Sequence, residues 1–241
     1  MSILKVKVNV DVVILCGGLG SRLRTLFPNT PKALASINDA PFLDKLMTII
    51  NKQGFEKFIL CVGHLKQQII DHYSNTTNFD VSYSLETEQL GTGGAIKNAL
   101  PLIKNKFFIA MNGDSFCNVS LKSLIEFHHK NNADVSVVIS PADIERDDVG
   151  QININKMNRI TSFKEKANNL DLRHVNSGIY VINKSVLAEF SGNIFSLERD
   201  FFPFLIQAKK IYGFKTNNPV YDIGTPDRYK KFIKNEVLND F

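Results

Sequence analysis

Apolar residues follow two alternating patterns along the first half of the chain. Short, mainly apolar runs occur at Val12–Leu15, Phe58–Gly63 and Phe107–Asp114, as is typical of strands buried on both faces of a parallel sheet. Between them lie segments with helical spacing, such as residues 41–54, where Gly54 is placed to end the helix. Further elements are expected as helices over 65–74, from Thr92 onward and over Leu121–Asn131, and as strands over Val81–Glu86 and Val135–Ile139. The alternation predicts a doubly wound α/β domain with a mostly parallel sheet.

The pattern changes in the second half of the chain. Short strands are expected at Gly150–Ile154, Ile160–Lys164 and Gly178–Ile182 with little helix between them, which predicts a small antiparallel extension of the sheet. One capping helix is expected over Thr225–Phe241. With 44% hydrophobic residues the chain can bury one large core, and no linker or repeat interrupts it. We therefore expect a single domain over residues 1–241.

Charge, hydropathy and cysteine content indicate which partners and which cellular compartment to expect for this protein. The net charge is +5, but the lysines are dispersed and acidic pairs such as Asp147-Asp148 interrupt them, so we expect no nucleic-acid partner. Apolar runs of membrane-spanning length are absent from the sequence, and the first residues carry charges, so we expect neither a membrane partner nor a cleaved signal. The three cysteines lack metal-ligand spacing and are odd in number, which favours reduced thiols in a cytoplasmic protein.

A glycine-rich loop follows the first strand. Gly17, Gly18 and Gly20 lack a Cβ, so backbone N–H groups in this loop can approach a polyphosphate closely. Arg22 and Lys32 are placed to fold over phosphates held by the glycines. Taken alone, the glycines favour a plain βα turn with solvated cations, because such turns are common.

Two better-known phosphate loops are excluded. No glycine run ends in the Gly-Lys-Ser/Thr that the Walker pattern requires. The dinucleotide-binding fingerprint needs a third glycine where Leu23 stands and a helix directly after the loop. Pro28 and Pro31 disfavour that helix, because each lacks an N–H and restricts the residue before it.

Seven segments of the chain, in a fixed order, match one family signature. The first is Gly-Gly-x-Gly-x-Arg-Leu followed by Pro-Lys, and the others are LETEQLGTGGA, MNGDSF, DDVGQI, FKEKA, NSGIYV and YDIGTPDRY. The chain thereby resembles the sugar-1-phosphate nucleotidyltransferases, or NDP-sugar pyrophosphorylases. The resemblance implies a Rossmann-like fold of the GT-A type, without the β-helix domain of some members. It also implies a nucleotide-binding half at about 1–140, a sugar-phosphate-binding half at about 141–224 and a C-terminal helix at 225–241.

The implied reaction is in-line attack by an oxygen of a sugar 1-phosphate on the α-phosphorus of a nucleoside triphosphate, with pyrophosphate leaving. It needs positioning and charge neutralisation more than proton transfer. Arg22 and Lys32 are the candidate catalytic residues: the arginine fork would clamp the β- and γ-phosphates, and the lysine would act as a point charge near the reacting phosphates. No protein nucleophile is required, so Cys16 is interpreted as a small buried residue.

Mg²⁺ is the expected cofactor, because two side-chain cations do not neutralise a triphosphate and the charge that develops on it. One or two carboxylates suffice to hold this ion. Asp114 is a candidate because it ends an apolar strand, where open α/β sheets bind ligands. The resemblance implies Asp222 as the second metal ligand. Taken alone, each aspartate is equally a turn or helix-cap residue.

The candidate nucleotide-binding residues lie at the ends of the predicted strands and are Leu15, Gly17, Gly18, Gly20, Ser21, Glu86, Gly91, Thr92 and Asn112. A carboxylate accepts from the paired N1–H and N2–H donors of guanine, so Glu86 or Glu88 favours GTP. The alternative is that backbone groups bind the base, with UTP or dTTP and a hexose 1-phosphate as substrates. The glycines from Gly91 to Gly94 either lie against base and ribose or form a helix-entry turn.

For the acceptor, the resemblance implies Gly150, Glu165, Lys166 and Asn176 as sugar-phosphate-binding residues. The alternative is a solvated hairpin around Lys166 and a turn at Asn176. Within the family, PKALASINDAPFL together with FIAMNGDSF most resembles the guanylyltransferases of D-glycero-α-D-manno-heptose 1-phosphate. That similarity implies an activated heptose for capsule or lipopolysaccharide biosynthesis.

Two functions of other classes stay open. A GT-A glycosyltransferase would share the fold, but it usually needs Asp-x-Asp, and this chain has Asn-Gly-Asp. A non-catalytic nucleotide-sugar-binding protein is disfavoured by the presence of Arg22, Lys32, Asp114 and Asp222. A homodimer is expected only because homo-oligomers are common among soluble proteins.

Overall fold

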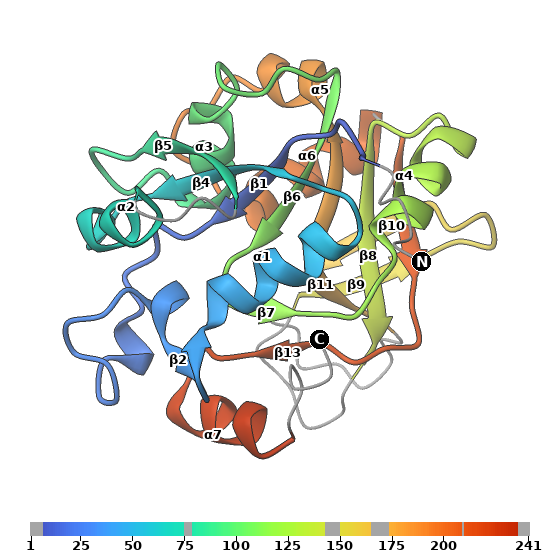
Figure 1. Ribbon diagram of the computed structural model, residues 1–241. Coiled ribbons are helices and arrows are strands. Elements are labelled where there is room, and N and C mark those ends of the chain that lie inside the picture. The colour runs from blue at the N-terminus through green and yellow to red at the C-terminus, as the bar shows by residue number, and fades with distance from the viewer. Residues whose placement is uncertain (1–6, 75–78, 143–149, 165–173, 209, 236–241) are drawn as a thin grey trace, which may run out of the picture.

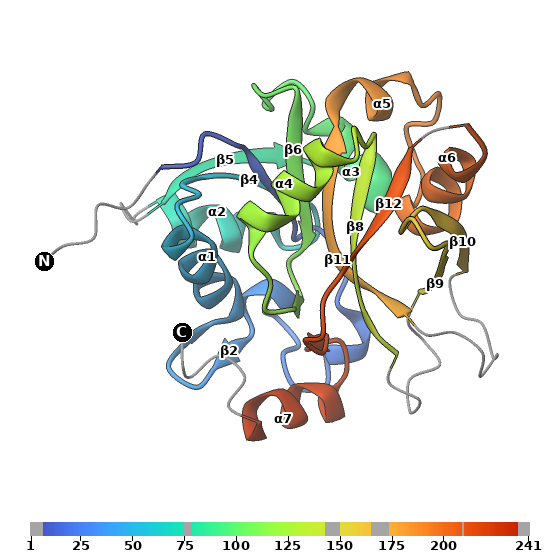
Figure 2. The same ribbon diagram turned by 90° about the vertical axis from the view of Figure 1, so that its right-hand side faces the viewer.

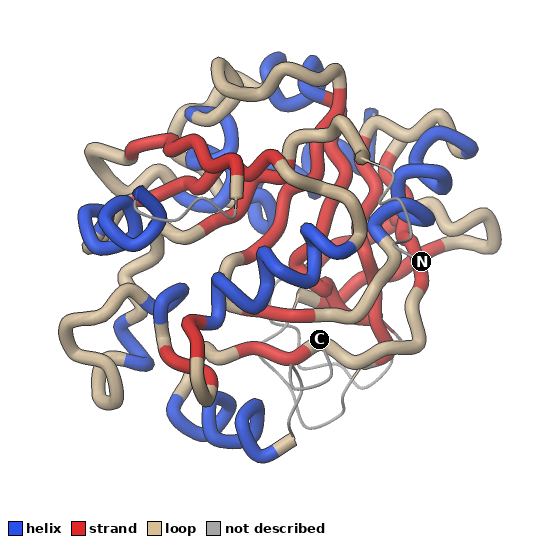
Figure 3. The backbone as a smooth tube through the Cα atoms, in the orientation of Figure 1, coloured by secondary structure: helices blue, strands red, loops and turns tan. Residues whose placement is uncertain are grey.

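The computed structural model describes residues 7–74, 79–142, 150–164, 174–208 and 210–235 (Figure 1). Within these ranges, nine strands form a mixed central sheet that carries helices on both faces (Figure 3). Its main path runs β10-β9-β11-β6-β1-β4-β5, with β8 beside β11 and β12 beside β8. The predicted fold class, a mostly parallel α/β sheet with a small antiparallel extension, is confirmed.

The parallel part of the sheet consists of β1 (Val12–Leu15), β4 (Lys57–Val62), β5 (Asp80–Leu85) and β6 (Phe107–Asn112). β1 is parallel to β4 on one side and to β6 on the other. The chain builds β4 and β5 on one side of β1 and then crosses over to build β6, so the strand order reverses at β1. Open α/β sheets bind ligands in the crevice at such a reversal.

The antiparallel part consists of β8 (Val135–Pro141), β9 (Gln151–Ile154), β10 (Ile160–Lys164) and β11 (His174–Asn183), and β12 (Ile211–Lys215) adds a strand parallel to β8. β11 is longer than the strand expected at Gly178–Ile182, and it pairs antiparallel with both β6 and β8. Two small sheets pair β2 (Ser36–Ile37) with β3 (Ala40–Pro41) and β7 (Ser115–Phe116) with β13 (Tyr221–Asp222).

A bulge in β11 shapes the sheet edge where β6 ends. Asn176 is opposite Ile139 of β8, but Tyr180 is opposite Val137, so four steps along β11 match two along β8. Gly178 lies in this bulge with φ of +71°, which glycine adopts without strain. The bulge brings Asn176 to the same edge of the sheet as the carboxyl end of β6.

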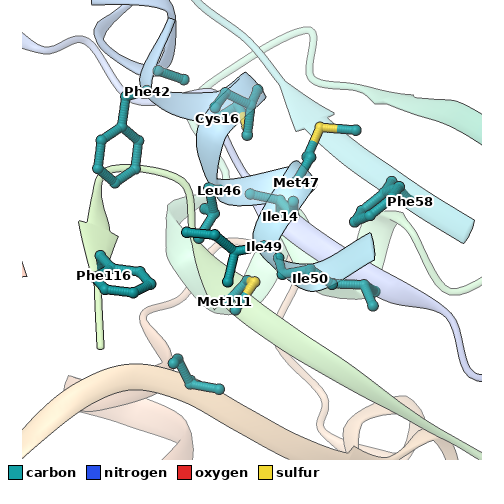
Figure 4. Packing of buried hydrophobic residues seen from close by; sticks show 14 of the residues in the cluster. Ile14, Cys16, Phe42, Leu46, Met47, Ile49, Ile50, Phe58, Met111 and Phe116 are labelled. Carbon is teal, nitrogen blue, oxygen red and sulfur yellow. The ribbon is translucent and has the colours of Figure 1, made fainter. Parts of the chain in front are cut away.

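Helices cover the two faces of the sheet in separate sets (Figures 1 and 2). One face packs against α1 (Phe42–Lys52), α2 (Lys66–Ser74) and α4 (Leu121–Lys130). α7 (Pro226–Lys234) lies beyond this face, where its Phe232 ring contacts Phe42 of α1 and Tyr221 of β13. The other packs against α3 (Gly91–Asn98), α5 (Lys184–Glu189), the π-helix η3 (Leu197–Phe201) and α6 (Phe202–Ala208). Figure 4 shows apolar side chains of α1, among them Met47 and Ile50, beside Ile14 of β1. Gly54, with φ of +100°, follows the end of α1 as predicted.

Little helix was expected between the three short strands of the second half, and the described residues between β9 and β11 contain none, but helices that the sequence analysis did not predict follow β11. Three helical segments, α5, η3 and α6, lie between β11 and β12. Phe201, Phe202 and Leu205 are all fully buried, and burial of consecutive residues hides the helical period. At the C-terminal end, α7 begins after Thr225, whose hydroxyl accepts from the Arg228 N–H. The expected continuation over 236–241 lies outside the described residues. Within the described ranges, every helix is too short or too polar to cross a bilayer.

Candidate active site

A cavity of about 480 Å³ opens at the carboxyl ends of β1 and β6, where the strand order reverses. Its walls include the residues that the sequence singled out for nucleotide binding and catalysis, together with one candidate metal ligand: Leu15, Gly17, Gly18, Gly20, Ser21, Arg22, Lys32, Glu86, Gly91, Thr92, Asn112 and Asp114. The fold therefore gathers segments that are far apart in the sequence around one space.

The start of the glycine loop lies directly against the Glu86 side chain. A Cβ on Gly17 would lie 2.3 Å from Glu86 Oε1 and 3.0 Å from the Gly63 nitrogen, so the absent side chain is what makes room for the carboxylate. Burial raises the pKa of Glu86, and the Leu90 N–H, 3.4 Å from Oε2, opposes that rise. The cavity thus presents a partly desolvated carboxyl group beside the loop.

The rest of the loop forms short turns instead of a long helix. Gly20 has φ of +59°, in the left-handed region. Two single 3₁₀ turns follow, η1 (Ser21–Leu23) and η2 (Lys32–Leu34). They are separated by the segment that contains Pro28 and Pro31, so the absence of a dinucleotide-binding helix after the loop was predicted correctly.

Lys32 forms an ion pair with Asp114. The distance from Nζ to Oδ2 is 2.5 Å, and the lysine side chain is only 14% exposed. Asp114 follows the end of β6, and the neighbouring Gly113 N–H donates to the Leu15 carbonyl at the end of β1. The pair therefore connects the loop after β1 with the loop after β6.

Asp222 is held beside Asp114 by the ribbon of β7 and β13, in which the Ile223 N–H donates to the Asp114 carbonyl at 3.0 Å. Its Oδ1 accepts from the Gly224 N–H at 2.8 Å and lies 3.4 Å from Arg228 Nη1. Asp222 therefore acts as a turn residue, which was the alternative interpretation of this aspartate. It also lies next to Asp114, the other candidate metal ligand.

The donor chemistry at this position fits Mg²⁺. This ion prefers hard oxygen ligands, keeps several waters and is usually held by one or two carboxylates, and the ribbon supplies two. Among the described residues there is no group of three or more His, Cys, Asp and Glu side chains that would form a closed metal site.

The glycines that start α3 serve helix packing. A Cβ on Gly93 would lie 2.2 Å from the Phe195 ring, and one on Gly94 would lie 2.2 Å from the Asn193 carbonyl oxygen. The N–H groups of both glycines donate to the Phe195 carbonyl. Gly93 and Gly94 therefore form a helix-entry turn, and contact of this segment with base and ribose stays a prediction. Gly91 lines the cavity, but its α-carbon also faces the Phe195 carbonyl.

Thr92 and Asn176 belong to one hydrogen-bond network. Thr92 Oγ1 donates to Glu198 Oε2 at 2.8 Å, and the Tyr180 hydroxyl donates to Glu198 Oε1 at 3.0 Å. Asn176 Nδ2 donates to the same tyrosine oxygen at 2.7 Å. Asn176 lies outside the wall of the cavity, and its Cβ is 3.5 Å from the position that a Cβ would take on Gly150.

Of the four acceptor candidates, two are described. Gly150 and Asn176 are in contact at the start of β9 and β11, whereas Glu165 and Lys166 lie outside the described residues.

Comparison with known proteins places the chain in a family. A family model for nucleotidyl transferases matches residues 11–236. The chain belongs to this family. It is 36% identical to a D-glycero-α-D-manno-heptose 1-phosphate guanylyltransferase of Aneurinibacillus thermoaerophilus, over 93% of this chain and 97% of the relative. A Campylobacter jejuni protein of the same name is 32% identical, over 94% of this chain and 100% of the relative.

A solved structure agrees with this placement. HddC from Yersinia pseudotuberculosis, complexed with GMP-PN, matches with a TM-score of 0.81 and 34% identity, over 94% of this chain and 99% of that chain. The resemblance to sugar-1-phosphate nucleotidyltransferases is thereby confirmed, and the protein is an enzyme of that family.

Several cavity residues of this nucleotidyltransferase were not among the predicted site residues: Cys16, Leu19, Ala33, Gln89, Ala95, Gly113 and Gly224. Most have small or apolar side chains, and the signal for them was their position within or next to the matched segments. Glu198 and Tyr180 were also missed: Glu198 lies outside the matched segments, and of the segment NSGIYV, which contains Tyr180, only Asn176 was singled out.

Cys16 of the nucleotidyltransferase lines the cavity but is buried, and burial raises the pKa of its thiol well above the ordinary value. A thiol held in the neutral form is a poor nucleophile. Its surroundings therefore agree with its interpretation as a small buried residue.

Proposed function

We propose that this nucleotidyltransferase joins GTP to D-glycero-α-D-manno-heptose 1-phosphate, giving the GDP-heptose and pyrophosphate, with Mg²⁺ as cofactor. The observation that carries the proposal is the cavity at the strand-order reversal, which has the glycine loop, Arg22 and the Lys32–Asp114 pair in its walls. The names of the relatives, and the binding of GMP-PN by a structural neighbour, support the choice of base and sugar.

The proposed roles at the nucleotide end follow from charge and exposure. Arg22 and Lys32 both line the cavity, and fixed cations there stabilise negative charge as it passes from the α-phosphorus to the leaving pyrophosphate. Because Lys32 is 14% exposed, its ammonium group is partly desolvated and its interaction with phosphate is stronger than in bulk water. Glu86 would accept hydrogen bonds from guanine N1–H and N2–H.

Asp114 and Asp222 are the residues that would hold the metal ion. When bound, Mg²⁺ supplies charge neutralisation for the phosphates and orients them. Lys32 and Arg228 now lie against these two carboxylates, so the negative charge of the ribbon is balanced by cations of the chain itself.

The proposed acceptor residues are Gly150, Glu165, Lys166 and Asn176. Asn176 supports this assignment by lying at the sheet edge where β6 ends, close to the cavity residue Asn112: a Cβ on Gly178 of the same bulge would lie 2.6 Å from Asn112 Nδ2. A sugar phosphate held there would reach the α-phosphorus of a nucleotide in the cavity from the side of β11.

We also place the enzyme in the cytoplasm. Its three cysteines are buried free thiols, which is typical of proteins from reducing compartments. A homodimer stays a prediction.

The test is pyrophosphate release with Mg²⁺ and D-glycero-α-D-manno-heptose 1-phosphate, compared across GTP, UTP, CTP, ATP and dTTP. We expect turnover with GTP, loss of turnover in Asp114→Asn, and full activity in Asp39→Asn, a change of the same kind at a carboxylate that is 84% exposed and pairs with Lys45. Turnover with another triphosphate alone would refute the role of Glu86. Pyrophosphate release only with a hexose 1-phosphate would refute the sugar assignment. Absence of pyrophosphate release with every sugar phosphate tested would refute the transferase reaction.

A further inference from the structure

One carboxylate accepts hydrogen bonds from three different segments of the protein. Glu198 accepts from the hydroxyl groups of Tyr180 in β11 at 3.0 Å, Thr92 in α3 at 2.8 Å and Ser196 at 2.9 Å. Thr92 lines the proposed nucleotide cavity, and the Tyr180 hydroxyl oxygen accepts a hydrogen bond from the Asn176 amide. Glu198 therefore lies where the nucleotide side and the proposed acceptor side of the site meet.

The direction of each hydrogen bond in this network is determined by the carboxylate. An ionised carboxylate only accepts hydrogen bonds, so the Tyr180 hydroxyl must donate to it. Tyr180 keeps its proton, because complete burial and the nearby Glu198 both raise its pKa. The tyrosine oxygen is consequently left as an acceptor, and Asn176 Nδ2 donates to it at 2.7 Å.

The orientation of the Asn176 amide follows from this chain of donors. With Nδ2 directed at Tyr180, Oδ1 faces the Gly178 N–H at 3.0 Å. One N–H of the amide and one lone pair of its oxygen remain available for an acceptor substrate. Reversing the amide would set two donors against each other at Gly178, so the network holds a single orientation.

We propose that Glu198 is a positioning residue for the acceptor substrate, which acts through Tyr180 by fixing the amide of Asn176 in the orientation that binds the sugar 1-phosphate. The inference rests on the proposed function, in which Asn176 contacts that substrate. Thr92 anchors the same carboxylate from the nucleotide side, and its hydroxyl also accepts from the Leu197 N–H at 2.9 Å. This second contact holds the start of η3 against α3 and keeps Glu198 in reach of Tyr180.

A purely structural role makes a different prediction. If Glu198 only tied η3 to the sheet, its replacement would lower the melting temperature and leave the Michaelis constants for both substrates alone. If Glu198 has a positioning role, its replacement should raise the KM for the sugar 1-phosphate and leave the KM for GTP unchanged. The reason is that the Asn176 amide, whose orientation would change, is the group proposed to bind the sugar 1-phosphate.

The test compares Glu198→Gln and Tyr180→Phe with Asp200→Asn as the matched control. Asp200 lies in the same π-helix, and its carboxylate accepts from the Ser196 N–H at 2.7 Å without a hydrogen bond to Tyr180 or Asn176. We expect both network variants to raise the KM for D-glycero-α-D-manno-heptose 1-phosphate about tenfold, with the KM for GTP changed by less than about twofold and with the control like wild type. The double variant should raise the KM for the heptose 1-phosphate no more than either single variant does, because both changes break the same series of hydrogen bonds from Glu198 through Tyr180 to Asn176.

The outcomes separate the inference from the proposed function. If wild-type enzyme turns over and both network variants keep the acceptor KM, or raise both KM values alike, the positioning role is refuted and the proposed function stands. If wild-type enzyme neither turns over nor binds the heptose 1-phosphate in calorimetry, the proposed function fails and the inference fails with it. Melting temperatures of all variants identify a fold defect, and Tyr180→Phe, which removes a single oxygen, keeps the test decisive if Glu198→Gln does not fold.

Discussion

At the residue scale, the site depends on a few groups whose charge or size is set by one neighbour. Lys32 and Asp114 neutralise each other at 2.5 Å, and Gly17 leaves the space that the Glu86 carboxylate fills. In both cases a substitution acts first on the partner: loss of the Lys32 ammonium leaves the Asp114 carboxylate unpaired, and a side chain at position 17 displaces the Glu86 carboxylate.

Lys32→Met should lower kcat about 10²–10³-fold, as removal of one preorganised electrostatic contact does at other active sites. The melting temperature should stay near that of wild type, because Asp114 is 38% exposed and can be solvated. The matched control is Lys45→Met, whose ammonium pairs with the exposed Asp39 at 2.8 Å. Steady-state kinetics of both variants check this, and equal activity of the two would contradict a role for Lys32 in the reaction.

Glu86 should make GTP binding sensitive to acid. Burial raises its pKa above the ordinary value of 4.5, so as the pH falls it takes up a proton earlier than a solvated glutamate would. Protonation removes a hydrogen-bond acceptor, and the KM for GTP should therefore rise as the pH falls through the raised pKa. The contribution of Glu86 to the free energy of unfolding changes in the opposite direction to GTP binding. Because the pKa of this carboxyl group is raised in the folded protein, the folded state loses stability as the pH rises through that pKa.

The measurement is the KM for GTP as a function of pH in wild-type enzyme and in Glu86→Gln. The glutamine variant should have a weaker affinity for GTP that no longer changes in this range. Parallel pH profiles of the two proteins would show that another group is responsible.

At the element scale, the site is positioned by close approaches between backbones. The start of α3 lies against the segment at 193–195 because Gly93 and Gly94 have no side chain. β7 and β13 bring Asp222 beside Asp114 through a ribbon of two residues per strand. These contacts determine where Thr92 and the candidate metal ligands lie.

Gly94→Ala should therefore reduce the free energy of unfolding by about 1–3 kcal/mol, as overpacking does. Its Cβ would meet a backbone oxygen at 2.2 Å, which cannot move aside as a side chain does. Gly18→Ala is the matched control for stability, because nothing lies within 4 Å of the position of its Cβ. Urea denaturation of both variants checks this, and equal midpoints would show that α3 tolerates displacement.

At the scale of the whole molecule, the two halves of the chain share one sheet. β11, from the second half, is inserted between β6 and β8 of the first half, and the core cluster on each face contains residues from both halves. The predicted boundary near residue 140 thus does not divide the core, and the division of substrate-binding roles between the halves stays a prediction.

Unfolding should consequently be a single cooperative transition. Because β11 and β12 pair with β6 and β8 across the two halves and both core clusters are shared, far-UV circular dichroism and tyrosine fluorescence should give the same urea midpoint. Two separate transitions would mean that the halves are stable units on their own.

The sequence by itself determined the features that depend on neighbouring residues. The buried strand at Val12–Leu15, the glycine loop after it, the proline-interrupted turns and the aspartate after β6 all follow from local composition, and their order indicated the family. The helices between β11 and β12 escaped prediction, since their apolar residues are buried all round and show no clear period. Only the tertiary structure decided which side chains meet: the pairing of Lys32 with Asp114, the Glu198 network and the packing of Gly93 against Phe195. Such contacts depend on strand register and on the bulge in β11, which bring together residues that are far apart in the chain, and no local pattern records them.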